Sequence, residues 1–256
     1  MSLNIAVLIK QVPDMNAVKI DRAAGKPVLS GQLVVSSFDE YAIEEAIQLK
    51  ERHGGEVTVI CAGPTSAKDA ITRALAMGAD KGIHLLTGGP GETTSADTLA
   101  VATALVGHLT TATFDLILLG QNSDDSTTGH VGPQVAELLG LPHVSSVTAI
   151  SVADRHLTIV RDTEDGKQTV ELDLPAVLLA LTGLNVPRYP SLKGIMAAKK
   201  KPVEQFPLTI TPVPNRVVWG DPFVPERAVL GVVIQDVPAA DAAKQLVGWL
   251  KERKLV

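Results

Sequence analysis

Apolar runs of strand length alternate with segments of helical periodicity through the first half of the chain. In residues 38–53, the apolar positions Ala42, Ile43, Ala46 and Ile47 recur at the spacing of one helix face. The predicted strands are 4–9, 57–61, 83–86 and 114–119, and the predicted helices are 38–53, 66–77, 96–109 and a segment after Gly129. Alternation of strands and helices of these lengths predicts a parallel sheet with helices on both faces.

The pattern changes after the fourth strand. Residues 147–152, 156–161 and 168–172 predict an antiparallel meander with polar turns, and a buried strand follows at 174–181. The predicted fold class is therefore α/β: a doubly wound, mainly parallel sheet with an antiparallel meander and an extended C-terminal arm.

The last quarter of the chain has a different composition. After Asn185 it is rich in proline and basic residues, and we do not expect this region to belong to the core. Five prolines between 207 and 225 predict an extended arm, and Ala239–Lys254 has the pattern of an amphipathic helix. We divide the chain into a nucleotide-binding α/β domain, 1–207, and an arm with its helix, 208–256. The arm needs a surface to cover, either on this domain or on another subunit.

Composition excludes several classes of protein. A formal charge of -5 argues against a nucleic-acid binder. The single cysteine, Cys61, cannot form an internal disulfide and is predicted to be a buried apolar residue. The chain has no apolar stretch of about 18 residues and begins without the features of a signal peptide, so no membrane insertion and a cytoplasmic location are expected.

The motifs of hydrolases and metalloenzymes are absent from the sequence. It has no G-x-S-x-G, H-E-x-x-H or Walker lysine pattern, and its six histidines have no metal-ligand spacing. Glu44 and Glu45 are adjacent in a predicted helix and face different directions, so they are interpreted as a charged flank. We predict no catalytic residue and no metal site.

The most informative segment is Gly120–Leu139, which follows the predicted strand 114–119. Small and polar residues continue from Gly120 to Gly132, and this stretch is called the nucleotide loop (residues 120–132). Such a loop at the carboxyl end of a parallel strand is where open α/β sheets bind ligands, and its backbone and hydroxyl groups can hold phosphate. An ordinary N-cap needs one polar residue, so the length of this loop favours a nucleotide-type ligand.

Two further segments are predicted at the same edge of the sheet. Residues 9–14, IKQVPD, follow the first strand, and residues 62–65, AGPT, follow the second. Three loops that converge on one crevice indicate a mononucleotide site, although each could be a simple βα connection. For His130, within the nucleotide loop, solvent exposure and ligand contact remain equally open.

Residues 184–202 combine apolar and basic side chains, and Pro187 and Pro190 stiffen the segment. Leu192, Ile195 and Met196 lie beside Lys193 and Lys199–Lys201. Apolar anchors with a basic rim suit docking onto an acidic partner. A short helix packed on the domain, with solvated lysines, explains the pattern slightly better when patterning alone is considered.

Several stretches together resemble the β subunits of electron-transfer flavoproteins. KQVPD (10–14), FDEYAIEEA (38–46) and ALAMGADKGIHL (74–85) are similar to the amino-terminal half of that family. IVRDTEDGKQTVELDLPAVLLA (159–180) is similar to its signature stretch, and NVPRYPSLKGIMAAKKK (185–201) to its recognition loop. The resemblance covers most of the chain and is loose only in the C-terminal arm.

The resemblance implies an electron carrier rather than an enzyme, with a sheet of the Rossmann-like, adenine nucleotide α-hydrolase-like kind. It implies a heterodimer with an α subunit, which carries most contacts to a redox FAD and on which the arm would pack. This chain would bury an AMP. Electrons would pass from dehydrogenases, such as acyl-CoA dehydrogenases, to a membrane quinone reductase.

The resemblance also implies residues for each site. Phe38 aligns with an aromatic residue that approaches the flavin, and Met15 stands where some members have a tyrosine. Leu192 aligns with the leucine that anchors the recognition loop (residues 184–202) on dehydrogenases, which favours docking. The implied cofactor contacts are Leu8, Ser36, Ser37, Phe38, Asp39, Ala62, Gln121, Asn122, Ser123, Asp124, Asp125, Ser126, Thr127, Thr128 and Gly129. The implied docking residues are Arg188, Tyr189, Leu192, Ile195, Met196, Lys199, Lys200 and Lys201.

One departure leaves the nucleotide open. Members that hold AMP commonly have three aspartates followed by Asn, Gln, Thr and Gly, whereas this chain has DDSTTGHVGPQ. VGPQVAE is closer to electron-bifurcating members, in which a second FAD takes the place of AMP and accepts hydride from NADH. We favour AMP and keep the second FAD as the alternative. A stand-alone nucleotide-binding sensor is a third hypothesis, which would not require the recognition loop.

Overall fold

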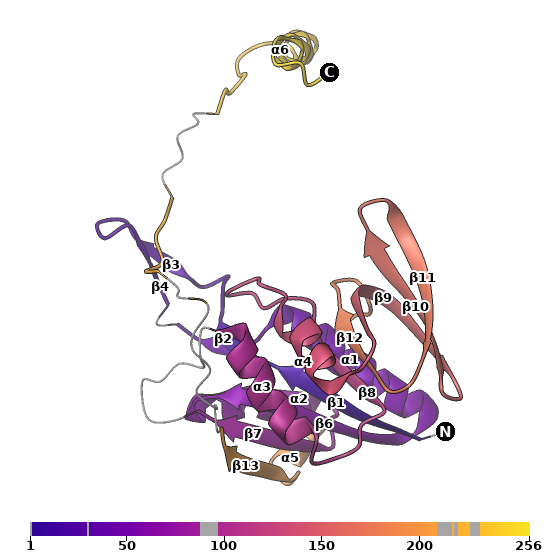
Figure 1. Cartoon of the computed structure of the whole chain (residues 1–256). Coiled ribbons are helices and arrows are strands. Elements are labelled where there is room, and N and C mark those ends of the chain that lie inside the picture. The colour runs from indigo at the N-terminus through magenta and orange to yellow at the C-terminus, as the bar shows by residue number, and fades with distance from the viewer. Residues whose placement is uncertain (1, 30, 88–96, 209–216, 218–219, 226–230) are drawn as a thin grey trace.

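A nine-stranded sheet forms the centre of the protein in the computed structural model (Figure 1), which describes residues 2–29, 31–87, 97–208, 217, 220–225 and 231–256. The strand order is β11-β10-β9-β12-β8-β1-β6-β7-β13. All neighbours from β9 to β13 in this order are parallel, and β9, β10 and β11 pair antiparallel. The strands are β1 (Leu3–Ile9), β6 (Gly55–Gly63), β7 (Lys81–Leu86), β8 (Leu116–Gly120), β9 (His143–Ala153), β10 (His156–Thr163), β11 (Gly166–Asp173), β12 (Ala176–Ala180) and β13 (Val203–Pro207).

Helices cover both faces of the sheet, as predicted for a doubly wound α/β fold. The helices α1 (Ser37–His53) and α2 (Lys68–Met77) pack on one face, with the 3₁₀ turn η1 (Thr65–Ala67) before α2. The helices α3 (Thr98–Leu109) and α4 (Val131–Leu139) pack on the other. Successive strand residues point to opposite faces, so each buried strand must be apolar throughout.

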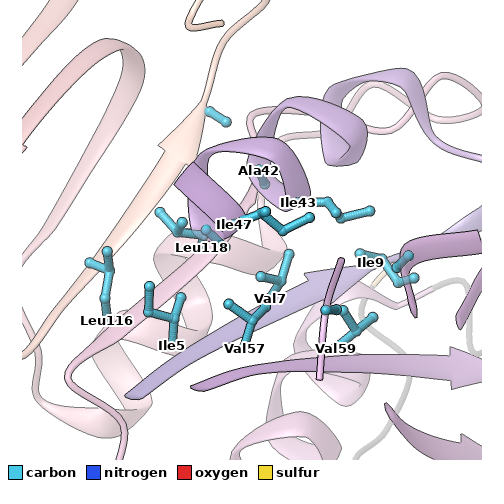
Figure 2. Packing of buried hydrophobic residues seen from close by; sticks show 14 of the residues in the cluster. Ile5, Val7, Ile9, Ala42, Ile43, Ile47, Val57, Val59, Leu116 and Leu118 are labelled. Carbon is cyan, nitrogen blue, oxygen red and sulfur yellow. The ribbon is translucent and has the colours of Figure 1, made fainter. Parts of the chain in front are cut away.

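The core between α1 and the sheet illustrates this packing. Figure 2 shows side chains of three parallel strands beneath one face of α1. The strand residues are Ile5, Val7, Ile9, Val57, Val59, Leu116 and Leu118, and the helix residues are Ala42, Ile43 and Ile47. The three- and four-residue spacing seen in the sequence is therefore the buried face of this helix.

The strand order reverses between β1 and β8. From β1 the chain proceeds to β6 and β7 on one side and then returns to β8 on the other. At such a switch point, neighbouring βα loops leave the sheet in opposite directions and open a crevice at the carboxyl ends of the strands. The fold therefore places the nucleotide loop, which follows β8, beside the segment that follows β1.

Several short elements differ from the prediction. The polar segment after β1 contains two small antiparallel pairs, β2 (Gln11–Pro13) with β5 (Leu33–Val35), and β3 (Lys19–Asp21) with β4 (Lys26–Val28). The expectation that nothing after Asn185 belongs to the core was wrong for Ala198, which is buried in a core cluster. The strand β13 was not predicted. It extends the sheet beside β7 although most of its residues are exposed, because pairing with β7 rather than burial defines it.

The C-terminal helix α6 (Ala239–Glu252) forms as predicted, but it buries none of its residues. Figure 1 shows it apart from the sheet. Leu246 and Val247, on its apolar side, are 50% and 46% exposed. Much of the predicted extended arm lies outside the described residues. The described part touches the β3–β4 pair, where the N–H of Val224 donates to the carbonyl of Gly25 at 2.8 Å.

Candidate nucleotide site and docking surface

A cavity of about 620 Å³ lies at the carboxyl ends of the central strands. Its walls come from the ends of β1, β6 and β8, the nucleotide loop and the first half of α3. The lining includes aliphatic side chains, such as Leu8, Val101, Leu105 and Leu119, together with hydroxyl, amide and charged groups from the nucleotide loop and Lys10. An apolar cavity with a few convergent polar groups is the usual form of a cofactor site.

Most of the predicted cofactor residues lie in this lining. Those that do are Leu8, Asp39, Ala62, Gln121, Asn122, Ser123, Asp125, Ser126, Thr128 and Gly129. The lining does not include Ser36, Ser37, Phe38, Asp124 or Thr127. Phe38 lies beside Gly120, where a Cβ would come within 2.6 Å of the Phe38 Cβ.

Asp124 joins the nucleotide loop to the start of α1. Its carboxylate accepts the Ser37 backbone N–H at 2.7 Å and the Ser37 hydroxyl at 2.6 Å, and its own N–H donates to Ser36 Oγ at 3.3 Å. Ser36, the residue before α1, makes no capping hydrogen bond with its side chain. The carboxylate from the loop therefore covers the positive end of this helix.

Two residues of the nucleotide loop have the left-handed backbone conformation. Thr127 and Gly129 have positive φ, 50° and 64°. A Cβ on Gly129 would lie 2.8 Å from the Asn122 side-chain oxygen, so glycine is required there for both space and conformation. The Ser123 and Ser126 hydroxyls are 2.8 Å apart and form a hydrogen bond across the loop.

Asp39 links three segments around the cavity. Its buried carboxylate accepts the backbone N–H of Lys10 at 2.7 Å and that of Gly120 at 2.9 Å, so it joins α1 to the ends of β1 and β8. Burial raises the pKa of Asp39 to about 7, against the two backbone hydrogen bonds, which lower it. A side chain at Gly120 would collide with this carboxylate.

Lys10 was missed as a site residue. Its amine lies 2.7 Å from Asp125 Oδ2. This ion pair joins the end of β1 to the nucleotide loop at the cavity. Burial alone would raise the pKa of Asp125, but the hydrogen bonds from Lys10 and Ser123 outweigh it, and the pKa is lowered. The signal was available, since KQVPD follows the first strand at the predicted edge.

The first turn of α4 faces the cavity without a side-chain cap. His130, its N-cap residue, makes no such hydrogen bond, and His130, Val131 and Gly132 all line the cavity. Thr98, Val101 and Leu105 of α3 were also missed. They follow β7, whose carboxyl end lies at the same edge as those of β1 and β6, so strand direction could have indicated them.

The recognition loop contains the short helix α5 (Leu192–Ala198), which packs on α2. Ala198 is buried, and a Cβ on Gly194 would collide with the carbonyl of Ala76. On the side away from α2, the side chains of Tyr189, Leu192 and Met196 are 88%, 77% and 66% exposed. The prediction of a short helix packed on the domain is confirmed, and this helix carries an exposed apolar face.

Two of the predicted docking residues have their charges engaged within the chain. Lys201 donates to the carbonyls of Leu75 and Ala79 at the end of α2, at 2.8 and 2.5 Å. Arg188 forms ion pairs with Glu44 and Glu51 of α1, at 2.8 and 2.6 Å. In this structure these two side chains hold the recognition loop on the domain, whereas Lys199 and Lys200 are exposed.

Glu44 and Glu45, interpreted from the sequence as a charged flank, are only 2% and 4% exposed, because residues 185–188 of the recognition loop cover them. Sequence periodicity placed these residues on α1 but could not show that a segment about 140 positions later packs over them.

Other expectations about chemistry can be compared with the described residues. Cys61 is buried as predicted, and burial raises the pKa of its thiol to about 12. Within the described ranges, no cluster of His, Cys, Asp and Glu could hold a metal ion. No helix there is long and apolar enough to cross a membrane.

Comparison with known proteins identifies the family. Residues 29–211 match the family model described as "Electron transfer flavoprotein domain". The electron transfer flavoprotein subunit beta of Syntrophomonas wolfei subsp. wolfei is 40% identical over 253 residues, which cover 98% of this chain and 97% of the relative. The protein of the same name from Bacillus subtilis is 35% identical over 260 residues, which cover 99% and 100%. The chain therefore belongs to the electron transfer flavoprotein β subunits, and it is an electron carrier subunit rather than a catalytic enzyme.

Proposed function

We propose that the cavity binds AMP and that this chain, with an α subunit, forms the carrier around a shared FAD. The observation that carries the proposal is the contrast between two helix ends. Asp124 already covers the start of α1, whereas the first turn of α4 opens into the cavity without a side-chain cap. Uncapped N–H groups at a positive helix end suit a phosphate.

The residues fit the parts of a mononucleotide. Leu8, Ala62, Val101 and Leu105 supply an apolar wall for a base. The hydroxyls of Ser126 and Thr128, with the first N–H groups of α4, would hold the phosphate. Lys10, paired with Asp125, supplies an ammonium group at the same cavity. Gly129 supports this fit, because a side chain there would fill the space beside Asn122.

The FAD would carry the redox chemistry, and this chain would position it. Phe38, half-buried beside Gly120, is the side chain proposed to approach the flavin. The arm and α6 would pack on the α subunit, since the apolar side of α6 is exposed here. Electrons would come from dehydrogenases such as acyl-CoA dehydrogenases and leave to a membrane quinone reductase.

The exposed face of the recognition loop would dock the dehydrogenase. Leu192, Tyr189 and Met196 offer apolar anchors, and Lys199 and Lys200 add positive charge at the rim. Basic rims accelerate encounter with acidic partners more than they strengthen the complex. Membership in the family leaves no ground for the hypothesis of a stand-alone sensor.

A second FAD in place of AMP is the alternative, and it would make the protein part of a bifurcating complex that oxidises NADH. Two observations favour it: the sequence VGPQVAE and the extension of the cavity from Leu105 to Gln11 and Leu33. A phosphate at α4 fits either nucleotide.

The test is to denature the purified αβ complex and to identify and count the nucleotides released. One FAD and one AMP per heterodimer are expected. Two FAD and no AMP would replace the proposal with the bifurcating alternative.

A further inference from the structure

Arg188, at the start of the recognition loop, is held by two carboxylates of α1. Glu44 accepts Arg188 Nε at 2.8 Å, Nη2 at 3.0 Å and the backbone N–H at 3.1 Å. Glu51, two helical turns later, accepts Nη1 at 2.6 Å and Nη2 at 3.0 Å. Two bidentate pairs fix the plane of the guanidinium as well as its position.

A second contact lies next to the first. Asn185 donates its side-chain amide to the Tyr41 carbonyl at 3.0 Å and to Glu45 Oε2 at 3.1 Å. The other oxygen of Glu45 accepts Arg52 Nη2 at 3.0 Å. The two ends of residues 185–188 are thus bound to the same stretch of α1 through adjacent buried carboxylates.

We infer that Glu44 and Glu45 are positioning residues, which hold residues 185–188 so that Tyr189 and Leu192 are presented to a dehydrogenase. The inference rests on the proposed docking function. Both glutamates are almost completely buried, and a buried carboxylate is tolerated only with charged or hydrogen-bonded partners. The recognition loop supplies Arg188 to one glutamate and Asn185 to the other, so the loop and the helix require each other.

The contacts of Glu44 with Arg188 and of Glu45 with Asn185, called the clamp, lie on the helix that also lines the cavity. The first turn of α1 carries Asp39, which is bonded to the ends of β1 and β8 at the nucleotide cavity. Glu44 and Glu45 lie in the next turns of the same helix. The same helix therefore carries the residues that hold the recognition loop and a residue that lines the cavity.

Hydrogen exchange of the αβ heterodimer tests the clamp directly. In Glu44→Gln, amides of residues 189–198 should exchange about tenfold faster. This factor corresponds to a loss of about 1.4 kcal/mol of interaction free energy between Glu44 and the recognition loop. Glu51→Gln should have a smaller effect, because Glu51 is the exposed member of the pair. Glu171→Gln is the matched control, since Glu171 lies 3.9 Å from His156 in the β10–β11 pair, at the opposite end of the sheet from β7 and β13.

Arg188→Lys provides an independent variant if Glu44→Gln does not fold. Lysine keeps the positive charge but cannot form both bidentate pairs with Glu44 and Glu51. The variant should therefore also accelerate exchange in residues 189–198. Exchange that stays at the Glu171→Gln level in the folded variants would overturn the inference.

Kinetics then separate positioning from general damage. With a purified acyl-CoA dehydrogenase as the electron donor, Glu44→Gln should raise the apparent KM for the carrier about tenfold, with kcat and nucleotide content unchanged. A parallel loss of kcat and nucleotide would contradict a positioning role. Leu192→Ala is measured alongside: an unchanged KM there would count against the docking function itself, whatever the exchange data show.

Discussion

At the scale of single residues, Asp39 has two opposing effects: its buried charge lowers the stability of the folded chain, and its hydrogen bonds hold the strand ends at the cavity together. Its carboxylate accepts two backbone N–H groups from the strand ends and lies in a buried position next to Asp124. Burial outweighs the two hydrogen bonds and raises its pKa from 3.8 to about 7. A charged Asp39 therefore costs stability in the folded chain, while its two acceptor oxygens keep the edges of the cavity together.

This pKa predicts a pH dependence of the free energy of unfolding. Between about pH 4 and 7 the folded state binds the Asp39 proton more tightly than the unfolded state, so stability decreases as the pH rises. The loss is at most about 4 kcal/mol. Glu44, Glu51 and Asp125, whose pKa values are lowered, act in the opposite direction and at more acidic pH.

Urea unfolding of the nucleotide-free chain at pH 5 and pH 7.5, with Asp39→Asn as the comparison, measures this effect. The variant should lose the pH dependence in this window. At pH 5 it should be less stable by about 1–3 kcal/mol, because its amide faces one backbone N–H with another donor. Parallel pH profiles for the two proteins would mean that Asp39 does not titrate in this range.

The hydroxyls of the nucleotide loop allow a second prediction at this scale. Ser126→Ala with Thr128→Val removes two hydroxyls from the cavity lining and should lower nucleotide retention and heterodimer stability by about 1–3 kcal/mol. Nucleotide content after gel filtration is the measurement. Thr163→Val, which changes a hydroxyl in the distant β10–β11 turn, is the control. Full occupancy in the double variant would exclude these hydroxyls from binding.

At the scale of elements, α5 depends on its neighbours. A helix of seven residues is not stable in isolation. It forms here because Gly194 allows close approach to α2, Ala198 is buried there and Lys201 binds the carbonyls at the end of α2. The exposed apolar face of α5 is therefore presented by a rigid support rather than by a free loop.

This support makes Leu192→Ala informative. Leu192 is 77% exposed, so the substitution should change the free energy of unfolding by less than about 0.5 kcal/mol. It should weaken reduction of the carrier by its dehydrogenase and leave nucleotide content unchanged. Turnover is measured at low carrier concentration, where docking limits the rate, and normal turnover there would eliminate the docking role.

At the scale of the whole molecule, the α/β domain is complete without α6. The two core clusters contain no residue of this helix, and α6 has no buried residue of its own. An amphipathic helix that covers nothing in its own chain gains little from its apolar face. We therefore expect it to contribute to assembly rather than to the stability of this subunit.

Deletion of residues 239–256 tests this expectation. The free energy of unfolding of the isolated chain, measured in urea, should remain within about 0.5 kcal/mol of the full-length value, because no core contact is lost. Association with the α subunit, followed by analytical ultracentrifugation, should be clearly weaker. A large loss of stability in the isolated chain would show that α6 folds back on the domain.

The main framework was predictable because its signals are local. Alternating apolar runs and helical periodicity identified β1, β6, β8 and the helices between them, and direction of chain placed the nucleotide loop at the correct edge. The β2–β5 and β3–β4 pairs were not predictable, because strands of three residues are too short to leave a periodic pattern. The strand β13 was missed because most of its residues are exposed, so it has no alternation of buried and exposed positions.

The sequence by itself determined the fold class, the family, the edge of the sheet at which the cavity lies and most of the cavity lining. These follow from periodicity, from strand direction and from motifs, each contained in a short stretch of chain. Only the tertiary structure decided the roles of Lys10, Asp39, Glu44 and Arg188. Their partners lie between about 30 and 140 positions away, and burial and ion pairing depend on which segments the fold brings together.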